Sequence, residues 1–322
     1  MDSVPYAFCE AVMATVRYKW GQCQDAADHL PEPWCSVARK QKMPTITVLE
    51  ENGEWMCGTV LMDEVNSLEE VFQIDRRFVK FDCIYVGSRL NSNDNKIVCS
   101  KEDVVQRVVP FLRRQTRPTC SLFFERNTQK EKNLMYLDLF RNFFVIGELV
   151  IPYVGTESRD FLASQIKDNP ALYEVLLFEE WPHSYEAEQL LVDFLDSPDR
   201  RSLIMWPKNR DSALRFNKRI LKAAFDSWLS GDNRRALSVC VGLNVSRDDV
   251  LGLPFPENVT RTEEVRESEY DKRSLIIWQK EDGSCLTLEF TDHSILIDTN
   301  PALFKLRERS ESESWDSDDS MC

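Results

Sequence analysis

The chain has 322 residues, 43% of them hydrophobic, which is enough for one large domain or two ordinary ones with a sizeable core. Its formal net charge of −14 repels nucleic acid and anionic membranes, so neither is expected as a partner. The ten cysteines form no CxxC pair, which predicts free thiols in a reducing compartment, either cytoplasmic or nuclear.

No secretory signal or membrane span is expected. Glu10 interrupts the only apolar run near the start of the sequence. The most apolar stretch, 143–154, is shorter than the ~20 residues that a membrane helix needs, and it contains Glu148.

The first 42 residues are mostly helical in pattern, and an alternating run follows at 45–62. Asn52-Gly53 divides this run, which predicts a β-hairpin. A helix is expected to begin at Ser100, because Ser100 and Asp103 have the spacing of a capping box. It lies between two predicted strands, 79–86 and 119–124.

Strands and helices then alternate along the chain. The predicted strands are 143–151, 172–178, 202–206 and 236–241. The predicted helices are 156–166, 184–196 and a third that begins after Asp211 or Ser212 as its cap. This third helix is expected to end just before Gly231, since a glycine readily adopts the positive φ that is common after a helix C-terminus. The charged segment 261–272 is expected to be a loop, and 274–298 reads as three strands with a turn at Asp282-Gly283.

The strand centres recur near residues 84, 122, 149, 175, 203 and 237, at intervals of 26 to 34 residues after the first. Such a period indicates stacked βα units, because one unit alone cannot bury both its strand face and its helix stripe. Several strands share apolar residues at i, i+3 and i+5, namely Phe81/Ile84/Val86, Ile146/Leu149/Ile151 and Leu172/Val175/Leu177. None carries the asparagine that usually turns the backbone in a leucine-rich repeat.

The predicted fold class is therefore α/β: a leucine-rich-repeat-like βα stack with mostly parallel strands. An N-terminal helical segment plus hairpin precedes the stack, and an antiparallel hairpin caps its C-terminal end. Three regions follow from this: a helical segment at 1–42, the βα region at 43–300, and an acidic, serine-rich tail at 301–322 that is expected to be disordered.

Two further features are candidate interaction sites. Four bases share one helical face, which would suit an acidic peptide: Arg215, Lys218, Arg219 and Lys222. An ordinary solvated face is the alternative interpretation. In the tail, acidic residues follow Ser310 and Ser317, which marks both as candidate phosphorylation sites whose added charge would favour docking on the basic stripe.

No catalytic constellation is found. The three histidines lie in unrelated contexts, and the sequence holds no phosphate-binding glycine loop, nucleophile elbow or zinc-ligand spacing. We therefore expect a protein that is not an enzyme and that needs no cofactor or metal.

Two segments resemble the F-box-associated region of nematode proteins. The first is 216–241, where these residues fall on the matching positions: Asn217, Leu221, Trp228, Leu229, Gly231, Asn233, Arg235 and Leu237. The second, 276–290, is similar to that family's closing hairpin. The start of the chain resembles the first helix of an F-box, with Val4-Pro5 in place of the usual Leu-Pro pair and an apolar stripe that includes Phe8 and Val12.

The resemblance implies a substrate-binding adaptor of a cullin–RING ubiquitin ligase. Val4, Pro5, Phe8 and Val12 would contact the linker protein of the ligase, and the open face of the βα stack would hold an unknown target protein. Two alternatives stay open: a repeat-type protein-binding module in which 1–42 is only a structural cap, and an enzyme whose site the sequence does not reveal. An F-box would expose Phe8 and Val12, whereas a cap would bury them.

Overall fold

A computed structural model describes residues 4–15, 27–61, 64–66, 68–87, 97–126, 128–178, 181–197, 202–206, 214, 217–230, 238–242, 245–267, 272–290 and 294–299. The chain divides into two compact units, Met1–Phe178 and Glu179–Cys322, so the boundary falls inside the region 43–300 that the sequence analysis treats as one.

The first unit is built on a mixed, mostly parallel sheet. Its strands are β1 (Thr45–Glu51), β2 (Glu54–Leu61), β3 (Glu64–Asn66), β4 (Phe81–Val86), β5 (Ile97–Cys99), β6 (Thr116–Phe124), β7 (Glu148–Pro152) and β8 (Glu174–Phe178). They lie in the order β8-β7-β6-β4-β1-β2-β3, with β5 also paired to β2. From β1 to β8 every pairing is parallel, whereas β2 pairs antiparallel with β1, β3 and β5. The predicted sequential order of β4, β6, β7 and β8 is thus confirmed.

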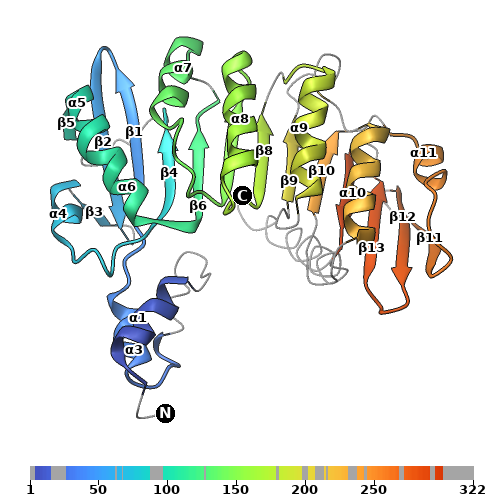
Figure 1. Ribbon diagram of the computed structural model, residues 1–322, viewed down its shortest axis with the longest axis horizontal. Coiled ribbons are helices and arrows are strands. Elements are labelled where there is room, and N and C mark those ends of the chain that lie inside the picture. Colours follow the sequence, from blue (N-terminus) through green and yellow to red (C-terminus); the bar gives the residue numbers. More distant parts are fainter. Residues whose placement is uncertain are drawn as a thin grey trace, which may run out of the picture. The chain divides into compact units, whose positions relative to one another are not determined.

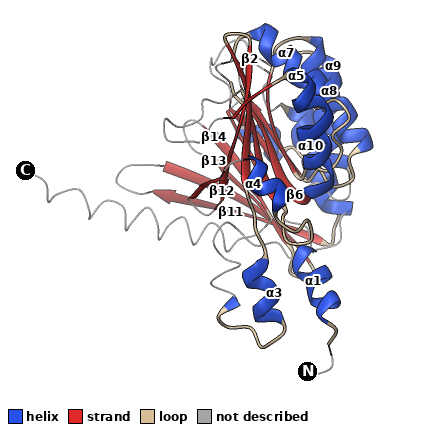
Figure 2. Cartoon of the chain, turned by 90° about the vertical axis from the view of Figure 1, so that its left-hand side faces the viewer, coloured by secondary structure: helices blue, strands red, loops and turns tan. Residues whose placement is uncertain are grey.

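The helices between these strands cover one face of the sheet, as Figures 1 and 2 show. They are α4 (Leu68–Gln73), α5 (Lys101–Asp103), the π-helical turn η1 (Val104–Val108), α6 (Val109–Gln115), α7 (Lys130–Leu139) and α8 (Thr156–Asp168). Phe124 of β6 contacts Phe140 after α7 and Phe161 of α8, with ring centroids 6.3 and 5.6 Å apart. The apolar positions that the sequence pattern selected at i, i+3 and i+5 are all buried in this core.

Local sequence explains where the first of these helices begins. Ser100 accepts a hydrogen bond from the amide of Asp103, and the Asp103 carboxylate accepts one from the amide of Ser100. The predicted capping box is therefore confirmed. Further along, Pro110 lies in the first turn of α6 and has no amide hydrogen to donate. The π-helical turn η1 comes just before it, and there the amide of Val109 donates to the carbonyl of Val104, five residues back.

Two further helices, α1 (Tyr6–Thr15) and α3 (Trp34–Lys40), precede the sheet. They share a small core of their own, formed by Cys9, Met13, Ala27, Val37 and Ala38. The helical character predicted for this segment is confirmed in its described part.

The β1–β2 hairpin turns at Asn52-Gly53, as predicted. Both residues have positive φ (54° and 88°), and Glu51 pairs with Glu54 across a two-residue turn. Glu50 fixes the hairpin to α7: its carboxylate lies 2.9 Å from Lys132 Nζ and accepts a hydrogen bond from the amide of Gly53, while its amide donates to the Tyr136 hydroxyl at 2.6 Å. The Lys132 hydrogen bond, helped by that of Gly53, lowers the pKa of Glu50.

The Glu50 contacts predict a pH-dependent contribution to stability. Because the pKa is lower in the folded state, the contribution is complete above the unfolded-state pKa of about 4.3 and is lost as the pH falls through the folded value. Glu50→Gln should therefore be less stable than the wild type at pH 7, with the difference shrinking below about pH 4.3. Urea unfolding at a series of pH values measures this. In a Lys132→Met background the pH-dependent part should largely disappear, and a difference that stays constant with pH would contradict the expectation.

The second unit has six described strands: β9 (Ser202–Trp206), β10 (Ser238–Gly242), β11 (Val259–Glu267), β12 (Lys272–Lys280), β13 (Cys285–Phe290) and β14 (Ser294–Asp298). β9 and β10 pair in parallel. β14, β13, β12 and β11 follow in that order, all antiparallel. The helices are α9 (Tyr185–Asp196), α10 (Lys218–Ser230) and α11 (Arg247–Leu251).

Helix α10 buries its apolar stripe, and Phe225 lies edge-on to Trp278 of β12 at 5.2 Å. The first turn of α10 is capped by Asn217, whose Oδ1 accepts from the amides of Arg219 and Ile220. Asp211 and Ser212, the predicted caps, lie outside the described residues. At its end, Lys280 Nζ donates to the carbonyls of Trp228 and Leu229. Gly231, the expected stop, lies outside the described residues.

Two predicted segments differ from the structure. The charged segment expected to be a loop at 261–272 is largely strand β11, which pairs in continuous register with β12. It lacks apolar alternation because it is an edge strand that exposes Glu263, Glu264 and Val265. The strand predicted at 143–151 begins only at Glu148, and residues 143–147 form a loop that leads into it.

The protein is thus an α/β protein, with a mixed, mostly parallel sheet, interleaved helices and a further antiparallel set of strands. Among the helices in its described residues, none combines the length and the hydrophobicity that crossing a bilayer requires.

Candidate functional site: the open face of the sheet

The parallel strands of the first unit have a second face, which none of the helices described in that unit covers (Figure 2). Side chains alternate between the two faces of a strand, so residues one position away from the buried core set point to this open face. The cross-strand register aligns them into rows. We call these rows the open-face rows: an apolar row (Thr47, Tyr85, Phe123, Val150, Leu176) and a polar row (Thr45, Cys83, Ser121, Glu148, Glu174).

The apolar row carries aromatic rings that contact one another. The ring centroids of Tyr85 and Phe123 are 5.3 Å apart. Phe123 also contacts Phe178, the last residue of β8, with ring centroids 6.1 Å apart, and the guanidinium of Arg126 lies 5.3 Å from the centroid of the Phe178 ring. Tyr85 and Phe123 are both partly exposed, whereas Thr47, Val150 and Leu176 of the same row are buried, as is Phe178. Large, rigid apolar side chains that keep contact with solvent are typical of protein-binding surfaces.

The polar row gives this face its charge. Glu148 and Glu174 are direct cross-strand partners on β7 and β8, and Ser121 Oγ donates to Glu148 Oε2 at 2.5 Å. Two neighbouring carboxylates on one sheet face favour a ligand that brings lysine or arginine.

Two other ionisable groups of the open face stay neutral at physiological pH. Burial raises the pKa of the Cys83 thiol to about 12. The neighbouring Cys83 and burial raise the pKa of the Tyr85 hydroxyl to about 12 as well. Neither group is therefore an activated nucleophile, and both act as polar but uncharged parts of the surface.

The sequence predicts binding on an open face but does not single out any residue there. The signal was present: counting alternate positions from the buried residues selects Tyr85 and Phe123 directly. It was missed because the pattern search followed the buried positions, which carry the stronger hydrophobic signal.

The N-terminal segment presents the predicted F-box-like residues on one helix. Phe8 has 55% of its surface exposed and lies edge-on to Trp34 of α3, with ring centroids 6.1 Å apart. Pro5 is exposed, whereas Val4 and Val12 are partly buried, Val4 against the small core of α1 and α3. The structure thus places all four predicted residues on α1 or immediately before it, with Phe8 and Pro5 the most accessible.

The predicted basic stripe is less available than the sequence indicates. Arg219 lies 3.7 Å from Glu188 and stacks on the Tyr185 ring at 4.1 Å, and Lys218 lies 3.5 Å from Asp249. Lys222 pairs with Asp226 one turn along the same helix. An acidic peptide would have to compete with these internal carboxylates. Arg215, Ser310 and Ser317 lie outside the described residues.

No group of three or more His, Cys, Asp or Glu side chains within the described ranges is arranged to hold a metal ion. Among the histidines considered above, His183 lies 3.1 Å from Glu188 and His29 is exposed, while His293 is not described.

No protein-family model matches the chain, and no curated protein matches it either.

Proposed function

We propose that this protein is a non-enzymatic interaction scaffold that acts as a substrate-recognition adaptor of a cullin–RING ubiquitin ligase. The helices α1 and α3 form its F-box-like segment, and Pro5, Phe8 and Val12 contact the linker protein of the ligase. The leucine-rich-repeat-like stack of parallel strands holds the target on its open face. The adaptor brings the target to the ligase, and the other subunits carry out the chemistry.

One observation carries this function: Phe8 is 55% exposed on a helix whose other side is buried in a core shared with α3. A helix that served only to cap the stack would place its largest apolar side chain against the sheet. An exposed aromatic ring on a helix with its own core is instead the arrangement expected of a binding surface.

The target is proposed to be a protein segment that lies across the strands of the first unit. Its apolar side chains would contact Tyr85 and Phe123, and a lysine or arginine would pair with Glu148 and Glu174. Tyr85 and Cys83 are uncharged, so the acidic selection of the partner would come from Glu148 and Glu174, while the Arg126 guanidinium lies over Phe178.

The adaptor function predicts that Phe8→Asp lowers affinity for the linker protein at least about tenfold, because a hot-spot contact of the complex is lost and a charge is introduced into it. The loss of the Phe8–Trp34 ring contact should lower stability by only about 1 kcal/mol. Co-precipitation followed by titration calorimetry measures the affinity. Val98→Asp is a matched control, because Val98 is an exposed apolar residue of β5, with 61% of its surface accessible. The Val98→Asp protein should bind the linker with the affinity of the wild type. Equal affinity for Phe8→Asp and the wild type would contradict the adaptor function.

A second candidate function is a repeat-type protein-binding module without a ligase link. It is favoured by contacts that tie α1 and α3 to the chain before β4: Glu10 lies 3.7 Å from Arg77, and Lys40 lies over the rings of both Tyr6 and Phe78. Such contacts suit a structural cap. Wild-type protein that fails to bind the linker at all, while binding a target through Phe123, would favour this module.

A further inference from the structure

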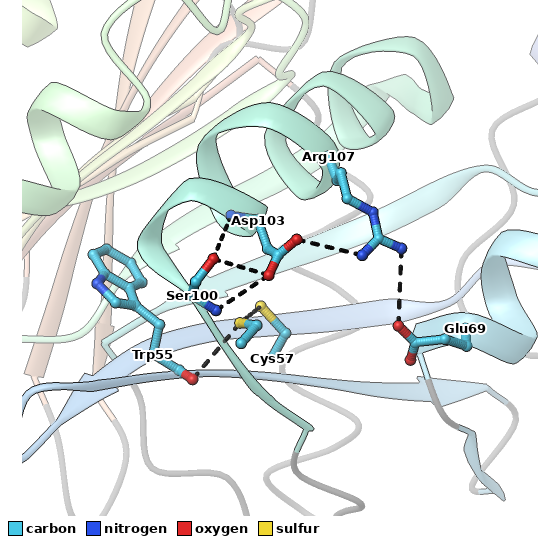
Figure 3. A network of polar contacts seen from close by, with 7 residues as sticks. Trp55, Cys57, Glu69, Ser100, Asp103 and Arg107 are labelled. Carbon is cyan, nitrogen blue, oxygen red and sulfur yellow. Dashed lines mark hydrogen bonds and ion pairs between the residues drawn. The ribbon is translucent and has the colours of Figure 1, made fainter.

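Two cysteines lie side by side on the helix-covered face of the first unit. Cys57 is on β2, and Cys99 is the last residue of β5, the short strand that pairs with β2. Trp55 is the direct partner of Cys99, so Cys57 lies diagonally opposite on the same face. The two Sγ atoms are 3.6 Å apart, and Cys99 Sγ also contacts the carbonyl oxygen of Trp55 (Figure 3).

The two thiols differ in access and in acidity. Cys57 is fully buried, whereas Cys99 is partly exposed. A hydrogen bond from Cys57 lowers the pKa of Cys99, against the opposing effects of partial burial and of the Asp103 and Glu69 carboxylates. The same hydrogen bond and burial raise the pKa of Cys57. An accessible thiol that ionises more readily beside a buried thiol is the arrangement of an attacking and a resolving cysteine.

We infer that Cys57 and Cys99 form a thiol-oxidation site that peroxide converts into a reversible disulfide. The Cys99 thiolate attacks one oxygen of hydrogen peroxide, which gives the sulfenic acid and releases hydroxide, and the hydroxide takes up the proton lost by Cys99 as water. Cys57 sulfur then attacks the Cys99 sulfur, its proton leaves with the hydroxyl group as a second water, and the S–S bond forms. Two thiols are oxidised and one peroxide is reduced to two waters. A dithiol reductant reverses the change.

Closing the bond requires a small local movement. The sulfur atoms must approach from 3.6 Å to about 2.05 Å. Cys99 immediately precedes Ser100, the cap of α5, whose partner Asp103 lies 3.4 Å from Arg107, which in turn lies 4.0 Å from Glu69 of α4 (Figure 3). Oxidation would therefore displace β5 and the first turn of the α5–α6 helix. This site is independent of the proposed adaptor function.

The test uses the full-length, reduced protein treated with a graded series of hydrogen peroxide, then alkylated, digested and analysed by mass spectrometry. We expect a linked peptide pair containing Cys57 and Cys99, lighter by two hydrogen atoms than the two free peptides, that disappears on treatment with dithiothreitol. Persistence of both thiols in alkylated form at peroxide levels that oxidise free glutathione would overturn the inference. So would linkage of Cys99 to any other cysteine.

Variants separate the roles of the two thiols. Cys57→Ser should abolish the linked peptide and leave Cys99 as a sulfenic acid that dimedone captures, whereas Cys99→Ser should leave Cys57 unmodified because it is buried. Cys83→Ser is the matched control: Cys83 is also partly exposed, and its removal should leave the linkage unchanged. The wild-type peptide map decides the inference even where a variant fails to fold, and loss of the linkage in Cys83→Ser would contradict it.

Discussion

Gly147→Ala is expected to lower the free energy of unfolding of the first unit by about 3 kcal/mol or more, because a methyl group has no room at this position. A Cβ atom on Gly147 would lie 2.4 Å from the carbonyl oxygen of Pro118 and 2.4 Å from the Tyr173 ring. The backbone cannot move away easily, since the Gly147 amide donates to Cys120 and its carbonyl accepts from Tyr173 and Glu174.

Denaturant unfolding, followed by hydrogen exchange of the peptides that contain β7 and β8, measures the effect of Gly147→Ala. Gly252→Ala is the control. The nearest atom to a Cβ there is the Asp248 carbonyl oxygen at 3.2 Å and φ is −78°, so the change should stay within about 1 kcal/mol. Equal stability of Gly147→Ala and the wild type would show that β6, β7 and β8 are not packed as described.

Asn169→Ala is expected to cost about 3 kcal/mol, because it leaves several buried polar groups without a partner. Asn169 is fully buried, and its Nδ2 donates to the Ile146 carbonyl at 2.8 Å and to Gln165 Oε1 at 3.0 Å. Its Oδ1 accepts from the amide of Ala171 at 3.1 Å. One side chain thus connects the segment before β7 to the segment before β8.

The conservative variant Asn169→Asp isolates the donor. The carboxylate keeps the acceptor for Ala171 but faces the Ile146 carbonyl and Gln165 Oε1 with no hydrogen to donate, so it should be at least as destabilising as Asn169→Ala at pH 7. Acidification, which protonates the carboxylate and restores a donor, should recover part of the loss. A pH-independent Asn169→Asp defect, measured by urea unfolding, would contradict this role for the Nδ2 group.

Asn169 also shows the limit of the sequence analysis. None of the predicted strands carries an asparagine of the type that turns the backbone in a leucine-rich repeat. The structure has a buried asparagine before β8 that hydrogen-bonds to the carbonyl of Ile146, in the segment before β7. Asparagine in a polar segment such as 167–170 reads as an ordinary turn residue, and only its burial shows its role.

Other local features could be predicted because their cause lies within a few residues. The Ser100–Asp103 capping box and the Asn52-Gly53 hairpin each depend on hydrogen bonds or dihedral angles of adjacent residues. The segment 261–272 failed as a prediction for the opposite reason. Its strand conformation comes from pairing with β12, and its charged side chains reveal nothing of that partner.

By itself, the sequence determined most of the alternation of strands and helices, although not α7, together with the sequential order of β4, β6, β7 and β8 and the apolar positions that fill their core. These follow from periodicity and from short-range hydrogen bonding, which act within one element or between neighbours in the chain. Only the tertiary structure decided which face of the sheet stays open, that Phe8 remains exposed, that the bases of α10 already have carboxylate partners, and that Cys57 lies beside Cys99. Each of these depends on residues distant in the chain, and their proximity is set by how whole elements pack.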